Sequence, residues 1–451
     1  MSSKFVLQQE DGTVENGNAR GAYSVDLQMS RDSADQVTNG INSVIVGGLR
    51  NKTTSKNSIV VGGESNTTGN RNTVTIVGGE GNSNSGGLSF IGAGLSNTIT
   101  DMASGYAVIT GGASNVNSSQ YGTISGGRSN TVLSGSYSSI LGGQSNATST
   151  GTHATVLGGY GNTASGSSSI AGGYSNTASN QSTVALGESN VASGLGAVAI
   201  GRSNTASGTG AIAIGTSNNV TYQLGFSGGN GNTVSVKGTA FGGSNTVAGG
   251  EWSAAIGTSN SITSTGNSYV IGDRIGSTAT YAFGTGNNSK AYLTGQRVHA
   301  SGWFILANGD QQISDLIASK LDTLSSAATT TLTLWDSSLI IPYGTNRAWN
   351  VQVKTVAVVT AIIGTATGVS VGDTLMQDDK LLFSKVSGVS SVVGTTSQDF
   401  ISSTSLGTAS MSYSAGASQE LALTFTAPTF AGGGSVTMRV VSKVELVEVA
   451  F

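Results

Sequence analysis

A short phrase returns along the chain from Asn51 to Asn260. Each copy contains an apolar alternation, one or two glycines, one variable residue and then Ser-Asn or Gly-Asn. The clearest copies are fourteen residues long: SNTASGSSSIAGGY, SNTASNQSTVALGE, SNVASGLGAVAIGR and SNTASGTGAIAIGT. A unit this small cannot bury an apolar face by itself, so it must stack on its neighbours. The repeat therefore predicts a linear array of stacked units instead of a globular core.

The spacing of the repeated asparagine shows how regular the units are. It is 14 residues in every interval from Asn162 to Asn232, and mostly 15 or 16 residues before Asn162. An odd insertion inside a strand would exchange its two faces. We therefore expect the extra residues of the longer units to lie in turns.

The composition agrees with a turn-rich β coil. The chain has 68 glycines but only 2 prolines, whereas disordered segments are usually rich in both. Charged residues make up 10% and the formal net charge is -3, so we expect no nucleic-acid partner. Because the chain has no cysteine, it forms neither disulfides nor thiolate metal sites, and we expect no metal and no cofactor.

The N-terminal sequence and the hydropathy of the chain bear on its location. The start, MSSKFVLQQEDG, lacks the basic residues and apolar centre of a secretory signal. No run approaches the roughly 20 apolar residues of a membrane-spanning helix. We therefore expect no membrane insertion, and a protein that either stays in the cytoplasm or leaves inside a particle released by lysis.

One unit can be interpreted as one turn of a coil. Val198 and Ile200 alternate with Ala197 and Ala199, which is the period of a strand with one face inward. Glycine and Ser-Asn follow at a corner, where asparagine tolerates left-handed geometry, and residues 205–207 form a second short strand. Such a turn buries few small side chains, so we expect the remaining apolar surface to pack on copies of the chain in a homotrimer.

The residue before Ser-Asn or Gly-Asn varies freely, which is typical of an exposed corner. Its identities include Glu64, Glu80, Ala113, Arg128, Gln144, Tyr160, Tyr174, Glu188, Arg202 and Thr216. Glu64 and Glu80 would lie about 5 Å apart on adjacent turns, a separation that suits a retaining glycosidase. We favour a solvated corner, since nothing in the surrounding sequence indicates a cleft.

A second column lies three residues before the apolar residue of the strand. It runs through Tyr106, Tyr121, Tyr137, His153, Ser167, Gln181, Leu195 and Thr209. Stacked tyrosines could offer rings to sugars, but we favour trimer packing or plain turn filling. His153 could hold an ion with its symmetry mates, but it has no second ligand nearby in sequence. His153 and His299 are the only histidines and no nucleophile motif occurs, so we expect no enzymatic activity.

The changes in pattern predict four segments. Residues 1–40 are an N-terminal cap, 41–290 the repeat shaft, 291–330 a joint, and 331–451 an antiparallel β-sandwich-like domain built from alternating runs such as NVQVKTVAVV and ELALTFTA. Within the joint, QISDLIASKLDTL has the apolar spacing of a helix, but its brevity and the threonine-rich continuation favour strand.

Large aromatic residues near the C-terminal end are candidates for receptor contact. They are Trp303, Trp335, Tyr343 and Trp349. Large rings in a β-domain more often belong to its core than to a contact surface. We therefore assign no receptor-binding residue from the sequence.

The repeats resemble the left-handed β-roll of trimeric autotransporter adhesin heads, and the whole chain resembles a family of tailed-phage fibre proteins. The second resemblance rests on the opening ARGAYSVDLQMSR, the GG-x-SNTASG repeats, the joint AYLTGQRVHASGWF, and the later runs IPYGTNRAWNVQVKTVAV and MRVVSKVELVEV. It implies an all-β, homotrimeric tail fibre with a left-handed parallel β-roll shaft and a C-terminal sandwich-like knob. No catalytic residue comes with the resemblance.

The same resemblance implies partners and a location. Residues 1–40 would attach to a phage tail or baseplate protein, and the C-terminal domain would bind a bacterial surface glycan or protein. The protein would belong to the virion, after assembly in the host cytoplasm and release by lysis. The alternatives are a capsid decoration or head fibre, a polysaccharide-degrading tailspike and a cell-anchored adhesin.

Overall fold

The computed structural model describes residues 20–69, 71–100, 105–301, 311–325, 327–334, 337–338, 347–364, 370–371, 373–386, 389–401, 409–415, 421–429, 431 and 434–450. Regular structure within these residues is β-strand throughout, without a helix. The chain divides into two compact units, Met1–Gly225 and Phe226–Phe451. The all-β fold class predicted from the repeat is confirmed.

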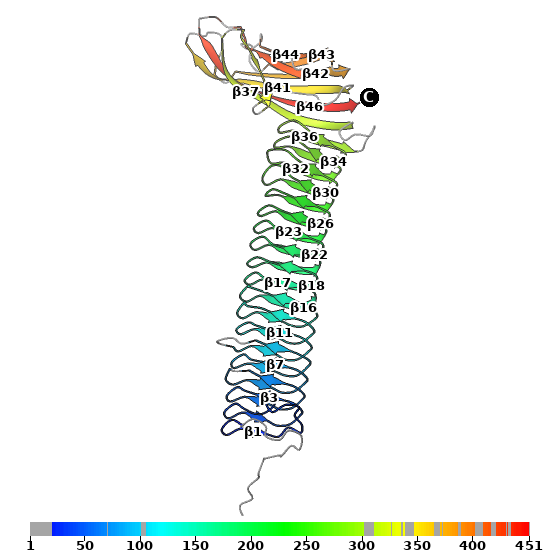
Figure 1. Cartoon of the computed structure of the whole chain (residues 1–451). Coiled ribbons are helices and arrows are strands. Elements are labelled where there is room, and N and C mark those ends of the chain that lie inside the picture. Colours follow the sequence, from blue (N-terminus) through cyan, green and yellow to red (C-terminus); the bar gives the residue numbers. More distant parts are fainter. Residues whose placement is uncertain are drawn as a thin grey trace, which may run out of the picture. The chain divides into compact units, whose positions relative to one another are not determined.

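The first unit is a parallel β-solenoid in which each turn contributes one strand to each of two sheets (Figure 1). The first sheet contains β1 (Val25–Asp26), β2 (Val44–Ile45), β4 (Ile59–Val60), β6 (Thr75–Ile76), β8 (Phe90–Ile91), β10 (Val108–Ile109), β12 (Thr123–Ile124), β14 (Ser139–Ile140), β16 (Thr155–Tyr160), β18 (Ile170–Tyr174), β20 (Val184–Glu188), β22 (Val198–Arg202) and β24 (Ile212–Thr216). The second contains β3 (Lys52–Thr53), β5 (Thr67–Thr68), β7 (Ser83–Asn84), β9 (Thr98–Ile99), β11 (Val116–Asn117), β13 (Thr131–Val132), β15 (Ala147–Thr148), β17 (Thr163–Ala164), β19 (Thr177–Ala178), β21 (Val191–Ala192), β23 (Thr205–Ala206) and β25 (Asn219–Val220).

Equivalent residues of successive turns pair directly, which places each repeat position in a column. Val184 pairs with Val198, and Leu186 with Ile200. Val198 in turn pairs with Ile212. The stack thus converts the sequence period into rows of identical or similar side chains, as the repeat predicts.

The size of the buried side chains follows the length of the turn. In the first unit, the inward position of the first sheet holds Ile124, Ile140 or Val156 in turns of 15 or 16 residues, whereas in the 14-residue turns it holds Ala185 or Ala199. All five are fully buried. A shorter turn leaves less space between its two strands, so only alanine fills it without overpacking.

The corner conformation differs from the sequence interpretation. The left-handed residue is the serine of Ser-Asn, with φ of 56° at Ser189 and 55° at Ser203, and not the asparagine. Asn190 and Asn204 are instead fully buried. The asparagine side chain is needed inside the coil, where it bonds the backbone, so the small serine takes the strained position.

The buried asparagines form a hydrogen-bonded ladder along the coil. Nδ2 of Asn190 donates to the carbonyl oxygens of Leu186 at 2.9 Å and Gly201 at 2.7 Å. Its Oδ1 accepts from the backbone N–H of Asn204 at 3.0 Å. The same contacts recur at the turns before and after it. The ladder therefore satisfies backbone groups that the glycine corner leaves unpaired.

A different set of polar contacts opens the first unit. Oε1 of Gln28 accepts from the backbone N–H of Asn51 at 2.7 Å, which is the contact that a preceding asparagine makes at later turns. Beside it, the buried Asp26 carboxylate pairs with Arg31 at 2.8 Å and lies 3.6 Å from Arg20. Gln28 thus forms the first rung of the ladder.

The second unit begins with further parallel turns of the same kind. One sheet contains β26 (Phe226–Asn230), β28 (Thr239–Gly243), β30 (Ala254–Thr258), β32 (Tyr269–Asp273), β34 (Phe283–Asn287) and β36 (Arg297–Ser301). The other contains β27 (Thr233–Val234), β29 (Thr246–Val247), β31 (Ser261–Ile262), β33 (Gly276–Ser277) and β35 (Lys290–Ala291).

The strands that follow are antiparallel (Figure 1). One sheet has the order β37 (Gln311–Ser325), β46 (Ser435–Ala450), β41 (Arg347–Ile363), β42 (Thr374–Val386) and β43 (Val389–Ile401). A small sheet has the order β38 (Thr329–Thr331), β45 (Leu421–Thr426) and β44 (Ser410–Ala415), and β39 (Thr333–Leu334) pairs with β40 (Ser337–Ser338). The predicted antiparallel C-terminal region is confirmed.

Residues 311–325, for which helix and strand were both open, form a strand. β37 pairs with β46 along its whole length, from Gln311 opposite Val449 to Ser325 opposite Ser435. Leu316 and Leu324 are buried, two positions of the same strand face. The long partner strand provides ladder bonds that an isolated helix of this length would lack, so the strand interpretation is confirmed.

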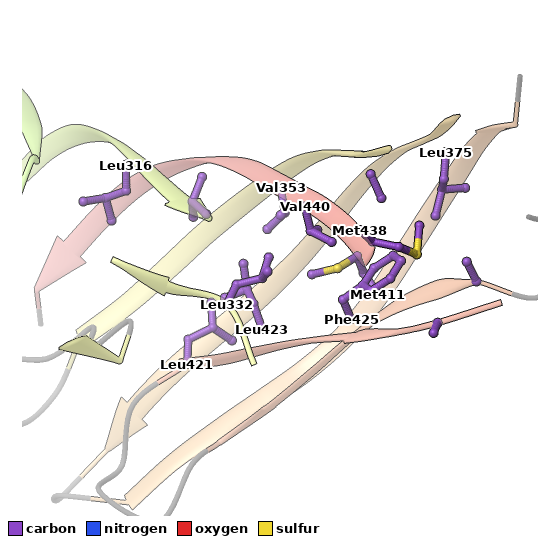
Figure 2. Packing of buried hydrophobic residues seen from close by; sticks show 14 of the residues in the cluster. Leu316, Leu332, Val353, Leu375, Met411, Leu421, Leu423, Phe425, Met438 and Val440 are labelled. Atoms are coloured by element: carbon purple, nitrogen blue, oxygen red, sulfur yellow. The ribbon is translucent and has the colours of Figure 1, made fainter. Parts of the chain in front are cut away.

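The two antiparallel sheets enclose a shared hydrophobic core. Figure 2 shows Phe425 of β45 beside Met411 of β44 and Met438 of β46. Leu423 of β45 and Val353 of β41 belong to the same cluster and are fully buried. Side chains from two sheets that meet in one apolar layer give the sandwich-like packing expected from the alternating runs.

Candidate functional site

The variable corner residues form an exposed column, as the sequence indicates. Glu64 and Glu80 are directly adjacent across neighbouring turns. The Glu64 carboxylate contacts the Arg50 guanidinium, which also bonds Asp32 at 2.9 Å. The Glu64 contact, followed by Asp32, raises the pKa of Arg50 above its usual value. Glu64 is therefore held in a surface ion-pair network, which is the solvated corner that we favoured over a catalytic carboxylate pair.

The aromatic column is a stack of nearly parallel rings. Ring centroids lie 4.9 Å apart for Tyr106 and Tyr121, 4.6 Å for Tyr121 and Tyr137, and 5.1 Å for Tyr137 and His153. The planes deviate by at most 7°. All four residues have positive φ and are exposed. Since the ring faces cover one another, only edges and hydroxyl groups remain for a ligand along the column, which disfavours a sugar platform.

The continuation of this column was predicted one residue too early. Val156 pairs with Ala171 and not with Ile170, so the left-handed positions after His153 are Ser168, Ser182, Gly196 and Gly210, not Ser167, Gln181, Leu195 and Thr209. Two adjacent apolar residues, Ile170 and Ala171, made the register ambiguous in sequence. His153 stacks on Tyr137, and the described residues contain no group of three or more metal-ligating side chains.

The outward face of the first sheet carries an apolar column in each unit. In the first unit its exposed members are Val46 (48%), Val61 (42%), Val77 (42%), Leu141 (55%), Leu157 (50%) and Ile214 (41%). In the second unit they are Phe241 (38%), Ile256 (42%) and Ile271 (46%), which pair in register. We call these residues the apolar columns. In the first unit the column is interrupted by Gly92, Thr110, Ser125 and Gly172. Exposed apolar side chains that gather on one face of a protein mark an interaction site.

A hollow of about 270 Å³ opens in the second unit where its apolar column ends. Its lining side chains come from three strands: Phe283 and Thr285 of β34, Arg297 and His299 of β36, and Ile313 and Asp315 of β37. The column that holds Ile271 continues with Thr285 and His299, so polar side chains replace aliphatic ones there.

Hydrogen bonds and charges shape the hollow. Thr285 Oγ1 and His299 Nδ1 lie 3.0 Å apart. Arg297 and Asp315 are opposite each other in the β36–β37 ladder, but Asp315 is paired with Lys443 at 3.6 Å. Among the described residues the Arg297 guanidinium has no carboxylate partner. The hollow therefore combines an accessible cation with hydroxyl, imidazole, carboxylate and aromatic groups.

Sequence reasoning missed the hollow. Its residues are separated by up to about thirty positions and meet only because β37 runs antiparallel to β36. The one available signal was the replacement of the aliphatic repeat residue by Thr285 and His299.

The C-terminal aromatic candidates are only partly described. Trp303, Trp335 and Tyr343 lie outside the described residues. The backbone of Trp349 is part of β41, opposite Phe383 of β42 and Glu448 of β46. No receptor-contact role is assigned to any of them.

A polar network ties the two C-terminal sheets together. The buried Asp379 of β42 accepts hydrogen bonds from the Tyr413 hydroxyl of β44 and from Gln377 Nε2, the latter at 3.1 Å. Gln377 Oε1 accepts from the backbone N–H of Met411 at 3.0 Å. Elsewhere in this region, hydrogen bonding to Lys443 lowers the pKa of Glu445. These groups are partnered inside the protein.

Comparisons with known proteins bear on the repeat. Residues 178–203 and 192–218 match the YadA head domain repeat, in two copies. A search of curated proteins gives no match to the chain. The described residues contain no helix that is long and apolar enough to cross a membrane.

Two solved structures show a remote similarity. The tailspike protein of Acinetobacter baumannii phage AM24 is 7% identical over 95% of this chain and 77% of that chain, with a TM-score of 0.19. The tailspike protein of Acinetobacter phage vB_ApiP_P1 is 10% identical over 97% of this chain and 81% of that chain, with a TM-score of 0.15. Similarity at these scores carries no argument about fold or function, and the repeat match remains the informative comparison.

Proposed function

We propose that the protein is a non-enzymatic, homotrimeric fibre of a phage virion. The observation that carries the proposal is the pair of apolar columns on a parallel solenoid whose central turns match the YadA head domain repeat. A solenoid that keeps this much aliphatic surface outside its own core needs a partner for it.

A second and third copy of the chain are the partner that fits these columns best. The columns recur at the spacing of the turns, so only a surface with the same repeat can contact them along their length. Alanine cores such as those at Ala185 and Ala199 bury little area, and packing on other copies adds the missing burial. Around a common axis, three such faces would close into one core.

The two ends of the fibre would have separate partners. The resemblance to tailed-phage fibre proteins supports attachment of residues 1–40 to a tail or baseplate protein and recognition of a bacterial surface glycan or protein by residues 331–451. Residues 41–290 would form the shaft and 291–330 the joint. The protein would be assembled in the host cytoplasm and released in virions by lysis.

Immunogold labelling of virions tests the location. Antibody against residues 331–451 is expected at the distal ends of tail fibres. Label on the capsid would favour the head-fibre alternative, and label on intact cells in the absence of virions would favour a cell-anchored adhesin, which the YadA head repeat also suits. Either result would overturn the tail-fibre proposal.

Catalysis is tested separately. Purified protein incubated with host polysaccharide is expected to release no new reducing ends. Their appearance at a rate proportional to protein concentration would contradict the non-enzymatic proposal and support a tailspike.

A further inference from the structure

We infer that the hollow between β34, β36 and β37 binds an acidic sugar residue, a hydroxylated ring that carries a carboxylate. The inference rests on the proposed function in host-surface recognition, and it adds to residues 331–451 a contact site at the end of the shaft and in the joint, with a stated ligand class. It is carried by the chemistry of six side chains that the antiparallel turn of β37 brings to one place.

The charged side chains provide the first part of the argument. Arg297 is exposed and has no carboxylate partner among the described residues, whereas Asp315 is already held by Lys443 at 3.6 Å. A guanidinium presents paired N–H groups that match the two oxygens of a carboxylate. The free charge in the hollow is therefore cationic and selects an anionic group.

Hydrogen-bonding groups provide the second part. The 3.0 Å contact between Thr285 Oγ1 and His299 Nδ1 fixes both side chains, and Asp315 adds carboxylate oxygens. Because Thr285 Oγ1 also donates to the Val298 carbonyl at 3.3 Å, the second imidazole nitrogen of His299 and the Asp315 carboxylate are the groups that can bond ligand hydroxyls. A bare inorganic anion would leave most of these groups unused, and a sugar ring would not.

The walls provide the third part. Phe283 is 39% exposed and Ile313 is 54% exposed at the hollow, so they offer apolar surface to the C–H groups of a ring. A volume of about 270 Å³ is below the usual range of drug-sized pockets, which suits a single sugar residue. Phe283 lies in register with Tyr269 on the preceding turn and with Arg297 on the following turn, so its ring borders the cation of the hollow on one side.

The position of the hollow matters for the experiment. It lies on the same sheet face as the apolar column of the second unit, so in the proposed trimer each hollow would border a neighbouring copy. The full-length oligomer is therefore the form to study.

Titration calorimetry of the full-length protein with glucuronate, glucose and inorganic phosphate tests the inference. We expect glucuronate to bind at least tenfold more tightly than either glucose or phosphate. Arg297→Gln should weaken glucuronate binding at least tenfold, and Arg297→Lys should have an intermediate effect because it keeps the charge but loses the paired donors. Arg128→Gln, the same charge change at an exposed corner of the first unit, is the matched control and should bind like the original chain.

Three results would overturn the inference. They are equal binding of glucuronate and glucose, binding of phosphate as tight as that of glucuronate, and unchanged binding by Arg297→Gln in a protein that keeps its β-sheet circular dichroism. Attachment of the fluorescent full-length protein to host cells, measured in parallel, reports the proposed function independently. Cell binding without glucuronate binding rejects the site alone, and glucuronate binding without cell binding rejects the recognition function.

Discussion

At the scale of single residues, the coil depends on asparagine and glycine at fixed positions. From Asn51 to Asn260 the asparagine of each corner is buried because its amide pairs with carbonyls on its own and the next turn, as Asn190 does with Leu186 and Gly201. The serine before it accepts a left-handed φ. The sequence alone could not show which residue of Ser-Asn is left-handed and which is buried. Asparagine is compatible both with the left-handed conformation and with burial among hydrogen bonds.

Removing one rung of the ladder should destabilise the neighbouring turns. Asn190→Ala leaves two carbonyls and the Asn204 N–H without their side-chain partner, at a local cost of about 2 kcal/mol or more. Hydrogen exchange in β20, β22 and β24 should then accelerate about 30-fold, the factor equivalent to about 2 kcal/mol. Asn180→Ala removes an amide whose bond to the Ser193 carbonyl at 3.0 Å is exposed to water, so it serves as the control for burial of the rung. Equal exchange in the two variants would contradict the structural role of the ladder.

The start of the coil should respond to acid through Asp35. Hydrogen bonding to Lys52 Nζ at 2.6 Å, followed by bonding to Ser33, lowers the pKa of Asp35 from 3.8 to about 2. Because the pKa of Asp35 is lower in the folded chain, its ionised carboxylate stabilises the fold above pH 3.8, and this stabilisation is lost as the pH falls towards 2. The melting temperature of the original chain should exceed that of Asp35→Asn slightly at neutral pH, and the difference should vanish near pH 2.

A double variant provides the control for this pH effect. In a Lys52→Gln background, the effect of Asp35→Asn on the melting temperature should depend less on pH, because only the weaker contribution of Ser33 remains. An undiminished pH dependence in that background would show that Lys52 is not the main cause.

At the scale of strands and turns, close stacking limits the side chains that each position accepts. A Cβ on Gly63, which has φ of 85°, would lie 2.1 Å from the carbonyl oxygen of Gly79 on the next turn. A Cβ on the preceding Gly62 would meet nothing within 4 Å. Two adjacent glycines of the same repeat therefore have opposite constraints.

This contrast gives a paired prediction. Gly63→Ala should destabilise the first unit by about 3 kcal/mol or more, through overpacking and an unfavourable φ. Gly62→Ala should change stability by no more than about 0.5 kcal/mol. Thermal unfolding followed by circular dichroism measures both, and equal melting temperatures would mean that successive turns are not stacked at the spacing described.

Elements with a regular period were predictable, and elements defined by partners far away in sequence were not. The alternation at Val198 and Ile200 predicted a strand, and the 14-residue interval predicted one turn. Residues 311–325 fitted both helix and strand because the decision depends on β46, more than 100 residues later. The hollow escaped detection for the same reason, since it requires the antiparallel backbone pairing of β36 with β37, which places Arg297 opposite Asp315.

At the scale of the whole molecule, the apolar columns connect the fold to assembly. Ile214 is 41% exposed although it belongs to a regular strand of the solenoid, whereas its neighbour Ala213 is fully buried. The single chain thus buries the smaller side chain and leaves the larger one outside. Association of three chains would give the aliphatic face the burial that the single chain does not.

A charge in the apolar column should separate assembly from folding. Ile214→Lys should keep the β-sheet circular dichroism but weaken the trimer, because three lysines would face one another in an apolar interface. Thr216→Lys, at the variable corner of the same strand, should leave the oligomer intact. Size-exclusion chromatography with light scattering compares them, and an unchanged mass for Ile214→Lys would exclude this face from the interface.

Sedimentation equilibrium of the purified full-length chain at micromolar concentration tests the proposed trimer most directly. The expected result is a single species with three times the chain mass of 44.9 kDa. A single species at the mass of one chain, with no association as concentration rises, would contradict it.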